Sequence, residues 1–209
     1  MTTLREYHSR VRTDILDAVP SDARQVLSVG CASGATEEHL LRRGATVAGI
    51  ELFHEAAAIA RDRGIKVIEG DASSVDVAQF GMLFDFIIYA DVLEHLPDPE
   101  GVIRRHIQHL RPGGCVYVTV PNFRHYSVLW KLAVCGEVIY EDAGILDRTH
   151  VRLTTRKMVL RWLNACGLKP LRVRHRFFGR RLRYVSAITG GLFKDVLAQH
   201  VAVLAIRPA

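Results

Sequence analysis

The sequence predicts a single α/β domain built on a doubly wound sheet with helices on both faces. Short apolar runs alternate with helical patterns from Gln25 to Val120, and this alternation is typical of parallel strands joined by helices. The chain has 209 residues, of which 49% are hydrophobic and 24% are charged, which is the size and balance of one globular domain.

The expected elements follow one another in a regular order. An amphipathic helix over 4–19, with apolar residues at spacings of three and four, ends at Pro20. Five strands are expected at Gln25–Val29, Thr46–Ile50, Lys66–Glu69, Phe84–Tyr89 and Cys115–Val120. Helices are expected at Thr36–Arg43, His54–Arg63 and Asp98–Leu110, the last with Asp98 as its cap.

The pattern changes after Pro121. Residues 122–150 form a long connection with helical character at Tyr126–Val134, and a helix is expected at Thr154–Ala165. Leu171–Phe177 and Val201–Ile206 are predicted to be two further strands that lie antiparallel to each other, so the sheet would have seven strands. A long insertion at this edge of an α/β sheet is typical of a substrate lid.

Composition excludes several classes of protein. The four cysteines lie far apart without a C-x-x-C pair, which argues against a zinc site of paired cysteines and against a disulfide framework. No apolar run approaches the roughly 18 residues that span a bilayer, and the chain starts without an apolar signal core. We therefore expect a reduced, cytoplasmic protein.

The net charge of +6 comes from one segment. Between Val151 and Arg183 there are 11 Lys and Arg and no acidic residue, whereas the other 17 of the 28 basic residues are outnumbered by 22 acidic ones. Within the basic 172–183 segment, the charges could meet an anionic acceptor, a lipid surface or RNA. They could equally protect a solvated strand edge. Because no RNA-binding module accompanies them, we rank a nucleic-acid partner last.

A glycine-rich turn, Gly30-Cys-Ala-Ser-Gly34, follows the first strand, and Glu51 ends the second strand 21 residues after Gly30. Glycine lets backbone amides approach a ligand closely, and a carboxylate at about this spacing binds ribose hydroxyls. A solvated strand end is the alternative for Glu51. A nicotinamide-dependent oxidoreductase is disfavoured, because Ala32 and Glu37 stand where a G-x-G-x-x-G pattern centred on Gly34 has its first and last glycines.

Five blocks, in this order, resemble the class I S-adenosylmethionine (SAM)-dependent methyltransferases. They are Val26-Leu-Ser-Val-Gly-Cys-Ala-Ser-Gly34, Ala48-Gly-Ile-Glu51, Glu69-Gly-Asp-Ala72, Phe84-Asp-Phe-Ile-Ile-Tyr-Ala-Asp-Val-Leu-Glu-His-Leu96 and Leu110-Arg-Pro-Gly-Gly114. Pro121-Asn122, the stretch Gly144-Ile-Leu-Asp-Arg-Thr-His150 and a basic helix resemble a bacterial small-molecule branch. The resemblance implies a Rossmann-like fold and SAM as cofactor.

The resemblance also divides the single domain of residues 1–209. It implies an N-terminal helix (1–24), a cofactor-binding core (25–120), a lid region (121–150) that takes the acceptor, and a C-terminal helix with the last strands (151–209). It assigns Asn122 and Tyr126 to the acceptor. The residues that it assigns to the cofactor are Gly30, Cys31 and Gly34 at the methionine part, Glu51 and Leu52 at the ribose, Asp71 and Ala72 at the adenine, and Asp91 near the methionine end.

Two positions depart from the family pattern. Ala32 replaces the usual central glycine of the turn, and Ser28 replaces an acidic residue that is common late in the first strand. Alanine does not tolerate every positive φ, and serine cannot offer a negative charge to the ammonium of the cofactor. We expect cofactor binding to survive these changes.

Methyl transfer from a sulfonium requires alignment of the acceptor and, for a hydroxyl or a protonated nitrogen, a base. The resemblance places His150 near the acceptor as the catalytic candidate, with a structural bond to Asp147 as the alternative. Asp91, Glu94 and His95 form a D-x-x-E-H cluster. Ubiquinone-pathway O-methyltransferases carry a related E-x-x-E-H that can bind a divalent metal, but we favour an ordinary turn and expect no metal.

The functional prediction is methyl transfer from SAM to a small molecule, at a hydroxyl of a sugar, lipid-linked or secondary-metabolite intermediate. N-methylation of a natural product is one alternative. A methyltransferase-like binding protein that has lost catalysis is the other, because the changes at Ser28 and Ala32 affect the expected cofactor cradle.

Overall fold

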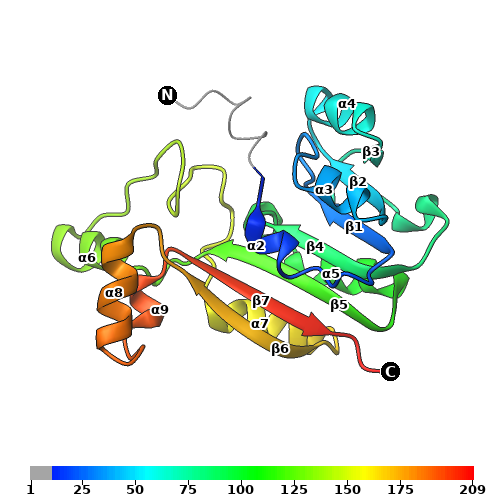
Figure 1. The fold of residues 1–209 in the computed structure, drawn as a ribbon. Helices are drawn as coiled ribbons and strands as arrows, with labels where there is room; N and C mark the ends of the chain where they lie inside the picture. The colour runs from blue at the N-terminus through cyan, green and yellow to red at the C-terminus, as the bar shows by residue number, and fades with distance from the viewer. Residues whose placement is uncertain (1–10) are drawn as a thin grey trace.

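The computed structural model describes residues 11–209, and its centre is a seven-stranded sheet in the order β3-β2-β1-β4-β5-β7-β6 (Figure 1). The first five strands are parallel, and β7 runs antiparallel to both of its neighbours. The predicted seven-stranded α/β fold is therefore confirmed. The strands are β1 Gln25–Val29, β2 Thr46–Glu51, β3 Lys66–Glu69, β4 Phe84–Ala90, β5 Leu110–Pro121, β6 Lys169–Arg176 and β7 His200–Ile206.

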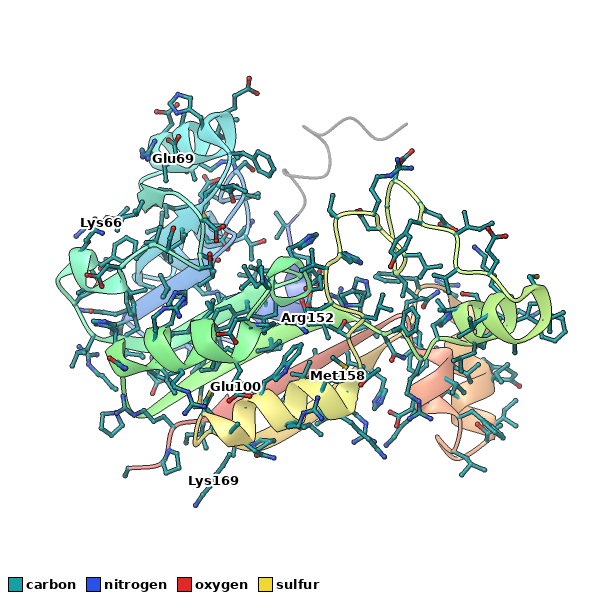
Figure 2. All side chains as sticks on the ribbon, turned by 180° about the vertical axis from the view of Figure 1, so that it is seen from behind. Lys66, Glu69, Glu100, Arg152, Met158 and Lys169 are labelled. Atoms are coloured by element: carbon teal, nitrogen blue, oxygen red, sulfur yellow. The ribbon has the colours of Figure 1, made fainter. Side chains whose placement is uncertain are left out.

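Helices cover both faces of the sheet. Figure 2, seen from behind, shows α5 and α7, which carry the labelled Glu100 and Met158, on the back face. The α-helices are α2 Thr13–Leu16, α3 Glu37–Arg42, α4 His54–Asp62, α5 Pro99–His106, α6 Tyr126–Trp130, α7 Arg156–Ala165, α8 Arg180–Ile188 and α9 Lys194–Leu197. Single turns are the 3₁₀ segments η1 Val77–Phe80, η2 Leu93–His95 and η3 Ile107–His109, and the π segment η4 Lys131–Cys135.

The alternation of side chains along β1 divides the core into two layers. Val26 belongs to the layer of Ile15 from α2 and Leu40 from α3, whereas Leu27 belongs to the layer of α5 and α7. Side chains of this size contribute about 1.5–3 kcal/mol each when fully buried. Burial on both faces fixes the register of the strands, and thereby the edge at which their carboxyl ends meet.

Two differences from the sequence prediction have local causes. The basic residues from Arg180 to Arg183 form the start of helix α8, which was not predicted and which begins after Gly179, whose φ is +112°. Strand β5 begins at Leu110, which pairs with Phe84 of β4 before an irregularity in the register, and Arg207 exchanges backbone hydrogen bonds with Gly113 (2.9 Å) and Gly114 (2.8 Å).

The N-terminal helix was expected over 4–19, and part of that range lies outside the described residues. Within the described part, α2 covers only Thr13–Leu16. Asp98 does cap α5 as predicted, because its carboxylate accepts from the Gly101 amide at 2.9 Å. Between residues 11 and 209, no helix has both the length and the apolar character that crossing a membrane requires.

Candidate functional site

The glycine turn after β1 needs glycine at both of its ends. Gly30 has φ +70° and Gly34 has φ +74°. A Cβ at Gly30 would lie 2.5 Å from a methyl of Val92, and one at Gly34 would lie 2.2 Å from Ile65. The Gly30 amide donates to the carbonyl of Ile50 at 2.8 Å, so the turn is fixed against β2.

Ala32 adopts φ +49° in the middle of this turn, a conformation that L-residues rarely take. Glu51 stabilises it, because its Oε2 accepts from the Ala32 amide at 2.7 Å. Glu51 Oε1 accepts from the Phe53 amide at 3.0 Å. The carboxylate is 5% exposed, and each oxygen retains a lone pair with which to accept from a ligand hydroxyl.

The end of β3 continues this edge of the sheet. The Gly70 amide donates to the Glu51 carbonyl at 2.9 Å, which places the next residue, Asp71, beside the end of β2. Asp71 accepts from the Ser73 amide at 2.7 Å, and hydrogen bonding to Ser73 lowers the pKa of its carboxyl. Leu52 is 59% exposed next to Glu51, and it offers an apolar surface at the same edge.

Asp91 lies just past β4 with φ +57°. Arg12 donates to its Oδ2 at 2.7 Å and Thr119 donates to its Oδ1 at 2.9 Å. Burial alone would raise the pKa of this carboxyl, but the charges of His200 and Arg12 keep it below the usual value. The sequence analysis missed Arg12, because nothing in its local pattern predicts a contact with a residue 79 positions away.

Three side chains meet where the turn after β4 contacts the end of the lid region. Potential metal-ligand atoms of Glu94, His95 and His150 all lie within 4.8 Å of one another. The rings of His95 and His150 are 4.9 Å apart. The carbonyl of Glu94 accepts from the Val151 and Arg152 amides, each at 3.0 Å. Asp91, the first member of the D-x-x-E-H pattern, is absent from this group of three.

His150 is not held by Asp147 through its side chain. Its Nδ1 lies 3.1 Å from the carbonyl of Ile145 and therefore donates to it. Asp147 instead accepts from the amide of Thr149 at 2.8 Å and from its hydroxyl at 2.6 Å. A neutral His150 with this tautomer keeps the lone pair of Nε2 available as a proton acceptor.

The two residues expected at the acceptor differ in what they offer. The side-chain amide of Asn122 donates to the carbonyls of Asp195 and Ala198, both at 2.8 Å, and its oxygen accepts from the Arg124 amide at 3.2 Å. Both amide hydrogens of Asn122 are thus used to fix the start of the lid region. Tyr126 is exposed at the start of α6.

A family model described as "Methyltransferase domain" matches residues 3–173 of the chain. The chain belongs to this family. A ubiquinone biosynthesis O-methyltransferase of Escherichia coli O127:H6 is 33% identical over 118 residues, which cover 54% of this chain and 48% of that protein. The chain thus spans about half the length of the curated relatives that it matches.

Solved methyltransferase structures share the fold. A SAM-dependent methyltransferase from Archaeoglobus fulgidus has a TM-score of 0.66 at 16% identity, covering 97% of this chain and 93% of that one. The N-methyltransferase NodS from Bradyrhizobium japonicum, solved with S-adenosylhomocysteine (SAH), has a TM-score of 0.63 at 20% identity, covering 98% and 87%. These likenesses confirm a Rossmann-like methyltransferase fold.

The residues of this methyltransferase domain fit SAM. The Glu51 carboxylate is fixed by two backbone amides and can accept from hydroxyl donors such as those of a ribose, and Asp71 is an acceptor at the neighbouring strand end. The glycine turn lies against Glu51, so backbone and carboxylate form one continuous edge. Asp91 and Arg12 provide paired charges beyond that edge, where β4 ends.

Proposed function

We propose that this chain transfers a methyl group from SAM to a hydroxyl of a small molecule, such as a sugar, lipid-linked or secondary-metabolite intermediate. The observation that carries the proposal is His150, whose Nδ1 is held by a backbone carbonyl at the junction of the lid region with the turn after β4. The similarity to curated O-methyltransferases over half of the chain favours oxygen as the acceptor atom.

The cofactor-binding residues in this proposal are those of the sequence analysis. Gly30, Cys31 and Gly34 surround the methionine part, Glu51 and Leu52 bind the ribose, Asp71 and Ala72 bind the adenine, and Asp91 lies near the methionine end. We add Arg12, because it is paired with Asp91 at 2.7 Å. When bound, SAM supplies an electrophilic methyl group, so the protein has to align the acceptor and remove its proton.

His150 is proposed to take that proton on Nε2, while the carbonyl of Ile145 holds Nδ1–H in place. The bond to Ile145 orients the imidazole within the lid region. The form of His150 that would act as the base is the neutral one. Because alignment and a base are sufficient for transfer from a sulfonium, the proposal assigns no metal to Glu94, His95 and His150. Tyr126 is proposed to contact the acceptor, and Asn122 to fix the backbone from which Tyr126 projects.

The test is His150→Ala in a methyl-transfer assay with the acceptor identified by a mass-spectrometric screen. Turnover should fall by about 10²–10⁴, the usual contribution of a general base, and the rising limb of the pH–rate profile should disappear. SAH affinity should stay unchanged. His39→Ala, on α3, is the control. A rising limb that persists in His150→Ala would contradict the base role.

The alternatives give different outcomes in the same assay. N-methylation of an amine that is already neutral would show a pH profile that does not depend on His150. A binding protein that has lost catalysis would bind SAH and show no turnover with any acceptor. The change at Ala32 does not favour this alternative, because the bond to Glu51 holds Ala32 in the turn.

We further propose peripheral contact with an anionic acceptor or membrane surface through the basic 172–183 segment and the rest of α8. Helix α8 begins with arginines and continues to Tyr184 and Ile188, which are 68% and 67% exposed. Basic and apolar side chains together favour an anionic interface. Co-sedimentation with vesicles containing phosphatidylserine, compared with purely zwitterionic vesicles, tests this contact, and equal partitioning would contradict it.

The four free cysteines support the proposed cytoplasmic location.

A further inference from the structure

A buried carboxylate lies directly behind the glycine turn. Glu37, in the first turn of α3, is 4% exposed, and its Oε1 accepts from the hydroxyl of Ser28 at 2.7 Å. Ser28 is itself 1% exposed, at the end of β1 that leads into the turn. Helix α3 and strand β1 are thus joined by a polar contact inside an apolar layer.

Within residues 11–209, Glu37 makes no ion pair. The two arginines whose charges influence it are both engaged elsewhere. Arg12 pairs with Asp14 at 3.0 Å and with Asp91 at 2.7 Å, and Arg63 pairs with Glu38 at 3.4 Å. A buried carboxylate without a cation is costly, and burial raises its pKa.

The Glu37 carboxylate influences the same glycine turn that Glu51 contacts. Burial raises the pKa of the Cys31 thiol, and the negative charges of Glu37 and Glu51 raise it further. Cys31 follows Gly30 in the glycine turn, so both carboxylates influence this turn. One of them, Glu51, is proposed to bind the ribose. The other lies beside Ser28, where the family pattern has an acidic residue and this chain has none.

We propose that Glu37 supplies the negative charge that Ser28 lacks and so stabilises the ammonium group of the methionine part of SAM. This inference rests on the cofactor site proposed above. A carboxylate on α3 then takes over the charge that the family pattern places on β1. The hydroxyl of Ser28 orients the Glu37 carboxylate, and the bound ammonium provides the counter-charge that it lacks in the free protein.

The test compares two ligands in calorimetric titrations: SAH, and the SAH analogue in which hydrogen replaces the α-amino group. Glu37→Gln keeps an oxygen that can accept from Ser28 and removes only the charge. This variant should bind SAH about 10- to 150-fold more weakly, the range for a hydrogen bond to a charged group, and should bind the deaminated analogue as the wild type does. Glu38→Gln, its half-buried neighbour on α3, is the matched control and should bind both ligands normally.

A double variant, Ser28→Asp with Glu37→Gln, returns the carboxylate to β1 and should recover most of the SAH affinity. Melting temperatures of all variants show that the comparison is made between folded proteins. Equal weakening of both ligands in Glu37→Gln would overturn the inference, because the contact would then only shape the turn. Unchanged SAH affinity would overturn it as well. A wild-type protein that binds neither ligand would instead reject the cofactor site itself.

Discussion

Replacing Glu51 by Gln separates its support of the glycine turn from its proposed binding of the ribose. Its two oxygens accept from the Ala32 amide at 2.7 Å and from the Phe53 amide at 3.0 Å, and the side chain is almost completely buried. Gln offers one oxygen, so its NH₂ group must face one of these two donors. An unsatisfied buried donor costs about 1–3 kcal/mol. For a chain of this size, each kcal/mol corresponds to about 2–4 °C in melting temperature.

The same substitution removes a charged acceptor for the ribose, so SAH should bind about 10- to 150-fold more weakly. Differential scanning calorimetry of the free protein and titration with SAH measure the two effects independently. Glu69→Gln is the control, because Glu69 lies opposite Glu51 in the register and contacts exposed His54 at 3.0 Å. Normal SAH affinity in a destabilised Glu51→Gln protein would show that Glu51 only supports Ala32, and would refute its assignment to the ribose.

Three further predictions concern other parts of the molecule. Amide exchange in the lid region should slow when SAH and acceptor are added, and equal protection with and without ligands would remove the lid from the mechanism. Ala32→Gly should raise the free energy of unfolding by up to about 1 kcal/mol, because glycine accepts the positive φ of the turn. A free energy of unfolding below that of the wild type in urea titration would contradict backbone strain at Ala32. Burial would raise the pKa of Asp195, but Arg156 and His175 keep it below the usual 3.8. Stability from this group is therefore complete above pH 3.8 and is lost as pH falls through its lower folded pKa, and Asp195→Asn should remove this acid-dependent part of the unfolding free energy.

The sequence predicted those features that depend on neighbouring residues. Strand β3 was placed at its observed bounds, because glycines flank a short apolar run at Gly64 and Gly70. Helix α8 was not predicted. Leu182, Val185 and Ile188 recur at helical spacing, but arginines dominate the start of the segment, and Val185 and Ile188 stay exposed in the structure.

Contacts between distant segments required the structure. Arg12 reaches Asp91 across 79 positions, and Ser28 meets Glu37 between a strand and a helix, so neither pair leaves a periodic pattern in the sequence. The departure at Ser28 was visible in the sequence, but its partner was not. The spacing suggested a bond between Asp147 and His150. The structure forms it between backbone atoms, from the His150 amide to the Asp147 carbonyl at 3.0 Å, whereas the two side chains bond to Thr149 and Ile145.

The central claim is that the glycine turn, Glu51 and Asp71 form a SAM site. Isothermal titration of the purified chain with SAM, SAH and NAD tests it most directly. We predict micromolar binding of SAM and SAH at one site per chain and no binding of NAD, because Ala32 and Glu37 replace the first and last glycines of a G-x-G-x-x-G pattern around Gly34. Tighter binding of NAD than of SAM, or no binding of SAM, would contradict the account.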